Sequence, residues 1–190
     1  MNKPAQVTFT MKKGEFQFLG REYSLNNPDF GQIWGDFLGG AHGGYATLEK
    51  YQLPGQPNMN VWHNKHAGHK TYMIGKIAGE INQIPDGFTL IEIPESEYYV
   101  ITYEWVPGNV ECNHHTGKYT NEQNWNTIFM PVSERINNWE CFDNMKNLRL
   151  PDGYKMYSDE GNKIYFIEVD NFGTPDGNRI EFWVPIKKND

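Results

Sequence analysis

The residues best suited to ligand chemistry are a glutamate and a tryptophan near the C-terminal end of the sequence. Glu168 stands among isoleucine, phenylalanine and valine in residues 163–170, and Trp183 lies two positions after Glu181 in residues 179–186. A carboxylate attracts positive charge, and the face of an aromatic ring attracts cations and flat apolar molecules. We therefore expect a pocket for flat or cationic organic molecules here.

Glu168 has two interpretations on residue type alone. In the first, it lies on the floor of a groove, where burial raises its pKa and a bound cation restores the ionised form. A unit charge about 4 Å away is then worth on the order of 4 kcal/mol at an effective dielectric near 20, before desolvation is subtracted. In the second, it faces solvent from the polar side of a half-buried strand.

Other aromatic residues are candidates for the lining of such a pocket. They are Trp183, Trp105, Tyr99 and Trp34. Each contact between one of these rings and a cation would add ~0.5–2 kcal/mol. Trp34 has an alternative place in the protein core, because its predicted helix needs a buried stripe. For Trp183 a core position and a lining position are both open.

The histidines cluster in the segment HNKHAGH, which contains His63, His66 and His69. Zinc can use three imidazole nitrogens and one further ligand, but a spacing of three and then three residues does not place the rings on one helix face. We expect a solvated polar loop without a metal. Cys112 with His114 or His115 would act as a nucleophile only in an ordered arrangement, and the sequence does not indicate one.

Composition excludes several classes of function. The net charge is −7 and no basic run occurs, so we expect no direct binding to duplex DNA. Two cysteines are too few for a disulfide framework. The N-terminal residues lack a secretory pattern, and no apolar run approaches the ~20 residues that span a bilayer. We expect a cytoplasmic protein without a membrane segment or cofactor.

The elements that position these residues can be predicted from the hydrophobic pattern. Residues 15–23 alternate as a strand does, and the cluster at residues 26–29 begins a helix whose apolar positions recur at helical spacing through residue 38. Residues 45–51 fit a strand or a short helix, of which we favour the strand, and we expect an irregular, polar segment at 53–68. Further strands are predicted at 71–76, 88–93 and 98–105, a second helix at 120–130, and a loop over most of 133–158.

The last two strands, residues 163–170 and 179–186, are separated by the turn-forming sequence NFGTPDGN, which predicts a hairpin. The element order strand, helix, strand, strand then occurs twice, with halves at about 15–93 and 98–187. We predict one α+β domain over residues 1–190, built from duplicated βαββ units with antiparallel sheets, two main helices and a ligand groove between the halves.

An ordered set of short motifs resembles the GyrI-like small-molecule-binding domain, the effector-binding domain of AraC- and MerR-type regulators. The motifs are residues 18–20 (FLG), 72–75 (YMIG), 91–94 (IEIP), 97–100 (EYYV), 165–168 (YFIE) and 180–186 (IEFWVPI), with Ile33, Trp34 and Phe37 on the first helix. Relative to that pattern, residues 53–68 are longer, and 109–120 and 143–159 are insertions.

The resemblance implies a duplicated βαββ fold and a groove that binds hydrophobic, often cationic, aromatic drugs. Glu168 matches the acid that meets the positive end of the ligand, and Trp183 matches the aromatic of the closing strand. The implied ligand-binding residues are Glu168, Trp183, Tyr99, Trp105, Trp34, Phe37 and Tyr72. Some standalone members of the family hydrolyse strained, cyclopropane-bearing natural products.

Three functions remain open from the sequence. The leading hypothesis is a standalone ligand-binding protein that senses, sequesters or detoxifies hydrophobic cationic or planar molecules, with a separate regulator as a possible protein partner. The second is a hydrolase in which Glu168 acts as general acid or base. The third is a structural or partner-binding module that has lost its ligand.

Overall fold

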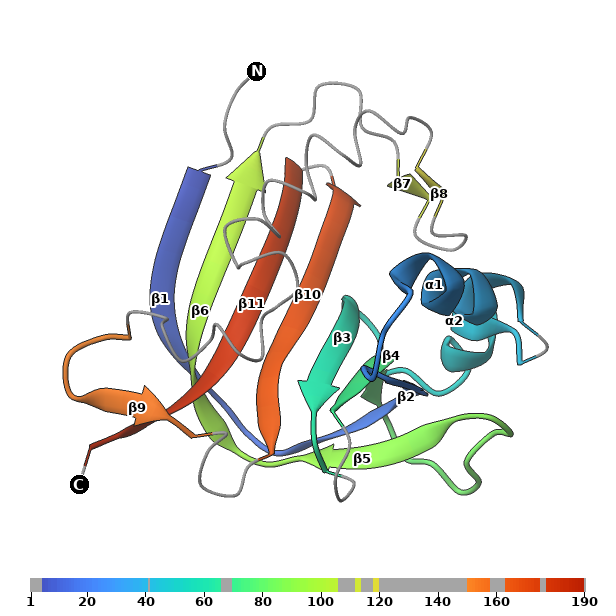
Figure 1. The fold of residues 1–190 in the computed structure, drawn as a ribbon, viewed down its shortest axis with the longest axis horizontal. Helices are drawn as coiled ribbons and strands as arrows, with labels where there is room; N and C mark the ends of the chain where they lie inside the picture. Colours follow the sequence, from blue (N-terminus) through green and yellow to red (C-terminus); the bar gives the residue numbers. More distant parts are fainter. Residues whose placement is uncertain are drawn as a thin grey trace.

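The computed structural model describes residues 5–40, 42–65, 70–105, 112–113, 118–119, 150–157, 163–174 and 177–189. Its main element is a large sheet that curls into a half-barrel, with two short helices at one end (Figure 1). All strand pairs of this sheet in the described residues are antiparallel. The predicted mixed α+β class with antiparallel strands is confirmed.

The strand order divides the sheet into two groups. From one edge inward, the first group is β1 (Ala5–Lys13), β6 (Ser96–Trp105), β11 (Gly177–Lys188) and β10 (Ile164–Thr174). The second group continues with β3 (Asn58–His63), β4 (Thr71–Ala78), β2 (Phe16–Ser24) and β5 (Thr89–Ile93). The two groups meet where β10 pairs with β3, which we term the β3–β10 junction.

Three short strands lie outside this order. β9 (Tyr154–Met156) pairs with β11, and β7 (Cys112–Asn113) pairs with β8 (Lys118–Tyr119) as a separate ribbon. The C-terminal hairpin and the strands near 71–76, 88–93 and 98–105 are present as predicted. The predicted helix at 120–130 lies outside the described residues, as does most of 133–158, so the duplication of βαββ units stays a prediction.

The first helix, α1 (Phe30–Gly39), is confirmed with its predicted start. Asp29 is the N-cap, and its Oδ1 accepts a hydrogen bond from the backbone N–H of Gln32 at 3.0 Å. Such a cap is worth about 1 kcal/mol. The apolar spacing buries Ile33 and Phe37 against the sheet, so the helix is held by one narrow face.

The predicted strand at 45–51 is wrong, because a short helix, α2 (Gly44–Leu48), occupies this segment. Tyr45 and Leu48 are both buried, and residues three apart share a face only in a helix. Gly43 begins the helix with φ at 80°, a left-handed conformation that glycine adopts without steric cost. The strand prediction followed the β-forming residue types and missed this spacing.

The prediction of an irregular segment at 53–68 is also wrong for β3. Met59 and Val61 face one side of the sheet, and Asn60 and Trp62 face the other, with all four side chains buried. The polar–apolar alternation covers only residues 58–61, and the asparagines lower the apparent strand propensity. β1 likewise precedes the first strand that the pattern predicts.

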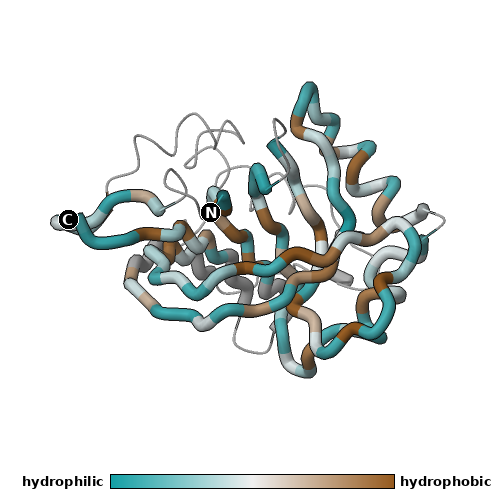
Figure 2. Tube along the Cα trace, turned by 90° about the horizontal axis from the view of Figure 1, so that it is seen from below, coloured by the Kyte–Doolittle hydropathy of each residue, from teal (hydrophilic) through white to brown (hydrophobic). Residues whose placement is uncertain are grey.

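The core is divided by the sheet into two clusters. The helix face, which α1 and α2 cover, buries Trp62, Tyr72, Ile74, Phe166, Phe182 and Val184 together with Ile33, Phe37, Tyr45 and Leu48. The opposite face buries Met59, Val61, Met73, Tyr98, Val100, Ile167, Val169 and Trp183. Figure 2 shows hydrophobic residues recurring along the strands, while the C-terminal end of β11 is hydrophilic. Each central strand is therefore buried on both sides.

Two glycines face each other where β2 pairs with β4. Gly20 is opposite Gly75 in the register. A Cβ atom on Gly75 would lie 2.2 Å from the carbonyl oxygen of Leu19, and one on Gly20 would lie 2.4 Å from the carbonyl oxygen of Ile74. The close approach of these strands therefore depends on both glycines.

In the described part of the chain, neither helix has the length and hydrophobicity to cross a membrane.

Candidate functional site

Glu168 lies at the β3–β10 junction, on the helix face of the sheet. It is directly opposite Asn60 in the register, and both side chains are only 2% exposed. This burial excludes the solvent-facing interpretation of Glu168. A fully buried carboxyl group needs a partner or must become neutral, because an isolated charge is costly to desolvate.

The carboxyl group of Glu168 is held by hydrogen bonds from two neighbouring strands. The Nδ2 group of Asn60 donates to Oε2 at 3.2 Å, and the hydroxyl of Tyr72 on β4 lies 3.5 Å from the same oxygen. The Nδ2 group of Asn60 also donates to Oδ2 of Asp170 at 3.2 Å. One amide therefore bridges two acids that are two residues apart on the same face of β10.

No ion pair joins either acid to a Lys or Arg side chain of the described residues. Burial raises the pKa of Glu168 well above its usual value, and the nearby charge of Asp170 raises it further. The donors of Trp62, Asn60 and Tyr72 oppose this rise in the Glu168 pKa.

The second acid and the nearest hydroxyl are shifted in the same direction. Burial raises the pKa of Asp170 to about 7, with the hydrogen bond from Asn60 opposing. Burial, and then the charge of Glu168, raise the pKa of Tyr72 well above its usual value. Burial therefore disfavours the ionised form of both acids, and a bound cation would favour it.

An unbroken series of aromatic rings surrounds the cluster. Trp62 stacks on Phe166 with centroids 5.0 Å apart and contacts Tyr72 at 4.9 Å. Phe166 in turn contacts Phe182 at 6.1 Å. These ring faces can hold a flat or cationic molecule against the acids, because they bury its apolar surface and attract its positive charge through cation–π contacts.

The helix α1 adds two rings to this series from above the sheet. Phe30 lies 5.4 Å from the ring of Tyr72 and 5.8 Å from that of Trp62, and Trp34 lies 6.5 Å from Tyr72. Phe30 and Trp34 are only partly buried. They are therefore the outermost rings of the series among the described residues.

The predicted site residues divide between this cluster and other places. Tyr72 touches Glu168, and Trp34 touches Tyr72. Phe37 is fully buried and packs against Trp34 at 6.0 Å and Tyr45 at 4.9 Å, so it supports the helix from beneath. Tyr99 is on the helix face and packs against its cluster, but from β6.

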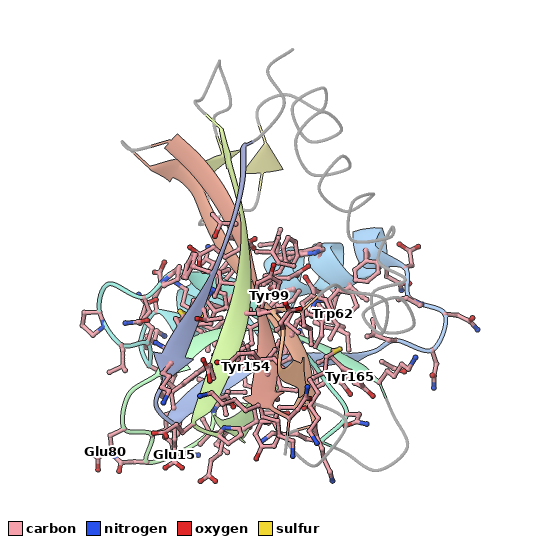
Figure 3. All side chains as sticks on the ribbon, turned by 90° about the vertical axis from the view of Figure 1, so that its left-hand side faces the viewer. Glu15, Trp62, Glu80, Tyr99, Tyr154 and Tyr165 are labelled. Carbon is pink, nitrogen blue, oxygen red and sulfur yellow. The ribbon has the colours of Figure 1, made fainter. Side chains whose placement is uncertain are left out.

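Trp183 is not brought to Glu168, and the side chain of Trp105 lies outside the described part of the structure. Trp183 lies on the opposite face, where it packs against Tyr98 at 5.9 Å and its indole N–H donates to Oε2 of Glu181 at 2.6 Å. Trp105 is the last residue of β6, opposite Asn178 in the register. Figure 3 shows Trp62 and Tyr99 in the middle of the molecule, whereas Glu15 and Glu80 lie at its periphery.

Sequence reasoning missed Asn60, Trp62, Phe30, Phe166 and Asp170. Asp170 and Phe166 each lie two residues from Glu168 on a predicted strand, and period two places all three on one face, so this signal was present. Asn60 and Trp62 were missed because β3 was missed. Phe30 was identified only as part of the apolar stripe of its helix.

The expected solvated loop is wrong for His63, which is fully buried at the end of β3. Its Nε2 lies 3.3 Å from Oε1 of Glu22, and its Nδ1 accepts a hydrogen bond from the backbone N–H of Lys65. His66, His69 and His114 lie outside the described residues. Within the described part of the chain, no three His, Cys, Asp or Glu side chains are placed to hold a metal ion.

Similarity to known proteins is found in structure. No family model matches the sequence, and no curated protein sequence matches it. A solved structure of SAV2435 bound to tetraphenylphosphonium superposes with a TM-score of 0.56, at 14% identity, covering 95% of this chain and 94% of that one. This level of identity establishes a common fold.

Two further structures share the fold. A candidate bacterial transcription regulation protein from Staphylococcus aureus MU50 has a TM-score of 0.50 at 13% identity, covering 95% of this chain and 98% of that one. An integron cassette protein from the mobile metagenome of Vibrio cholerae has a TM-score of 0.51 at 9% identity and covers 95% of each chain. The chain therefore has the fold of these proteins, and its resemblance to the GyrI-like effector-binding domain is confirmed at the level of the fold.

Proposed function

We propose that this chain binds hydrophobic organic cations at the cluster of Glu168, Asn60 and Tyr72 and the rings around it. The observation that carries the proposal is a carboxyl group only 2% exposed, without a Lys or Arg partner in the described residues, and enclosed by aromatic side chains. A cation on Oε1 or Oε2 of Glu168 supplies the missing counter-charge, and the rings supply apolar area.

The structural neighbour SAV2435 supports this class of ligand, because its solved structure contains tetraphenylphosphonium, a cation made of aromatic rings. The chemistry at Glu168 is of the same kind. Desolvation and Coulomb attraction oppose each other in such a site, and a unit charge about 4 Å from the carboxylate contributes on the order of 4 kcal/mol before desolvation.

A ligand reaches Glu168 past α1. Phe30 and Trp34 are the partly exposed rings that contact Tyr72 and Trp62. Because Glu168, Tyr72 and Trp62 are almost fully buried, these two side chains must move for a ligand to enter. The helix itself is tied to β2, because Asp36 forms an ion pair with Arg21 at 3.0 Å and accepts a hydrogen bond from Tyr23 at 2.9 Å. We therefore expect the two side chains, rather than the whole helix, to move.

The strand order supports a duplicated architecture for this site. β2, β3 and β4 lie in the order β3–β4–β2, and β6, β10 and β11 lie in the order β10–β11–β6. We take these as the strands of the two βαββ units, which places Glu168 and Asn60 where the units meet. A ligand there contacts both halves, as suits an effector sensor, a transcription-regulator domain or a sequestering protein.

The test uses two tetraphenyl ions of nearly one shape and opposite charge, tetraphenylphosphonium and tetraphenylborate, together with the smaller neutral molecule triphenylphosphine oxide. Binding is followed by tryptophan fluorescence and isothermal titration. We expect wild-type protein to prefer the phosphonium. Glu168→Gln keeps the shape and removes the charge, so it should weaken phosphonium binding by ~1–3 kcal/mol, about tenfold to a hundredfold, and leave the phosphine oxide nearly unchanged.

Glu95→Gln is the matched control, because Glu95 is exposed in the turn between β5 and β6. It should leave all three affinities unchanged. Equal affinity of wild-type protein for the phosphonium and the borate would overturn the proposal. So would a Glu168→Gln protein that binds the phosphonium as wild type does.

A hydrolase is the second candidate, favoured by one observation. Glu168 and Asp170 share the Asn60 amide, burial raises the pKa of Glu168 well above its usual value, and burial raises the pKa of Asp170 to about 7. Such a pair can act as general acid and general base near neutral pH. The substrate would be an electrophilic, strained small molecule of the cyclopropane-bearing type.

One variant separates the two candidates. With a cyclopropane-bearing electrophile as substrate, a hydrolase should form product in wild-type protein, and Glu168→Gln should still bind the substrate but fail to turn it over. Product is followed by mass spectrometry. If wild-type protein binds the compound and returns it unchanged, the binding function stands alone.

A further inference from the structure

The cluster at Glu168 contains two buried acceptors that the described residues do not satisfy. Oε1 of Glu168 and Oδ1 of Asn60 both lack a hydrogen bond of normal geometry from any described residue, although the indole N–H of Trp62 lies close enough to the Glu168 carboxyl group to lower its pKa. The opposite atoms of the same groups, Oε2 and Nδ2, are bonded to each other. The two unsatisfied acceptors therefore belong to one locked pair of side chains.

The two side chains that carry these acceptors lie next to each other in the sheet. Asn60 and Glu168 are directly paired across two antiparallel strands, and the Cβ atoms of such a pair are about 5 Å apart. The side chains are both 2% exposed, so bulk water does not reach them in the folded protein. Asp170 adds a third acceptor group, since its Oδ2 shares the Nδ2 donor with Glu168.

We propose, building on the proposed function, that this site selects cations that carry N–H groups, namely aromatic amidines, guanidines and primary amines in their protonated form. A quaternary phosphonium or ammonium satisfies the charge of the site but cannot donate a hydrogen bond. An amidinium supplies both, because its N–H groups diverge in one plane and can reach Glu168, Asn60 and Asp170 together.

The aromatic surroundings fit the same ligand class. An aryl amidinium is flat, and the stacked pair Trp62 and Phe166 offers a flat face beside the acids. A site built to hydrogen-bond its ligand discriminates strongly against an analogue that lacks the donors, since its buried polar groups then stay unpaired. The N–H count of the ligand, rather than its charge alone, should therefore set the affinity.

The experiment compares 4-phenylbenzamidinium with its N,N,N′,N′-tetramethyl analogue, which has the same charge and no N–H, and uses tetraphenylphosphonium as the reference. Affinities are measured by isothermal titration near pH 7.5. We expect wild-type protein to bind the amidinium at least about tenfold more tightly than the tetramethyl analogue. The ratio of these two affinities measures the selectivity of the site for cations that carry N–H groups.

Asn60→Leu removes the Oδ1 acceptor and the bridging donor at similar volume, and it should reduce the ratio to about twofold or less. Asn82→Leu, at an exposed turn, is the matched control and should retain the wild-type ratio. If Asn60→Leu does not fold, as judged by circular dichroism, Asp170→Ala at a half-buried position replaces it, with a smaller fall in the ratio expected.

The outcomes separate this inference from the proposed function. If wild-type protein binds tetraphenylphosphonium and both amidines with equal affinity, the cation site stands and the N–H selectivity is overturned. If the ratio is high but unchanged in Asn60→Leu, the assignment to these acceptors is wrong. If none of the three cations binds, the proposed function fails and the selectivity fails with it.

Discussion

Glu168 and Trp183 lie on neighbouring strands and face opposite sides of the sheet. In the register of β10 and β11, Ile167 pairs with Trp183 and Glu168 pairs with Phe182, and directly paired side chains share a face. Trp183 accordingly packs in the cluster of the opposite face. A ligand held by Glu168 touches Trp183 only by crossing the sheet.

Substitution of Trp183 should therefore affect stability and leave the site intact. Trp183→Ala removes a large side chain that is 8% exposed, so we expect the free energy of unfolding to fall by about 3–5 kcal/mol. Urea unfolding measures this loss. Tetraphenylphosphonium affinity of the folded protein should stay within about twofold of wild type, and Trp183→Phe serves if the alanine variant unfolds. A tenfold weaker affinity with native circular dichroism would place Trp183 in the site.

Substitutions of Phe37 and Trp34 on α1 should have different effects, the first mainly on stability and the second mainly on binding. Phe37 is fully buried beneath the helix, whereas Trp34 is partly exposed and touches Tyr72. Phe37→Ala should cost about 3–5 kcal/mol of stability. Trp34→Ala should cost less stability and weaken cation binding by ~0.5–2 kcal/mol through the lost ring face. Thermal unfolding and titration of both variants check this, and a Trp34→Ala protein with unchanged affinity contradicts it.

Asp170 should make stability fall as pH rises. Its pKa is raised from 3.8 to about 7 in the folded protein, so between these values the folded state holds a proton that the unfolded state has released. Stability from this group is complete below about pH 4 and is lost as pH rises through about 7. Asp170→Asn cannot titrate and should not show this loss.

The difference between the two proteins isolates this effect from all groups but Glu168. Urea unfolding at about pH 4.5, 6 and 7.5 gives the stability of Asp170→Asn minus that of wild type, and this difference should increase with pH. The charge of Asp170 also raises the pKa of Glu168, so its removal in the variant adds to this difference in the same direction. A difference that is constant or decreases over this range would mean that Asp170 ionises freely in the folded state.

The glycine pair of β2 and β4 should not tolerate a methyl group. In Gly75→Ala the new Cβ would lie 2.2 Å from the carbonyl oxygen of Leu19, so the strands must separate and the variant should lose several kcal/mol, about the range of severe core substitutions. Gly35→Ala is the control, because a Cβ there meets nothing within 4 Å in the middle of α1. It should stabilise the protein by about 0.5–1 kcal/mol. If both alanine variants change the thermal stability equally, the close contact at Gly75 is not what limits substitution there.

The parts of the fold with strong local signals were predictable. The helix α1 has a capping residue, an apolar stripe and two terminal glycines, and the C-terminal hairpin joins two β-branched and aromatic runs across a turn-forming sequence. β3 has no such signal. Its asparagines look like loop residues because the reason for their burial is a carboxylate on β10, more than a hundred residues away along the chain.

The candidate site was predictable in its acid and not in its surroundings. Glu168 is conspicuous on an apolar strand, and Tyr72 and Trp34 follow from the family resemblance. Trp183 was paired with Glu168 because the two strands are neighbours, but the sequence does not fix which residues of a hairpin pair directly. A shift of one residue in register moves a side chain to the other face of the sheet.

The β3–β10 junction has a mechanical consequence for the whole domain. It is where the two four-strand groups of the main sheet join in the described residues, and Asn60 and Glu168 are a directly paired couple within it. A molecule that forms hydrogen bonds to both side chains cross-links the two strand groups at this junction. Amide hydrogens of β3 and β10 should then exchange more slowly, and the domain should resist being pulled apart at its centre while its outer edges, β1 and β5, stay as they were.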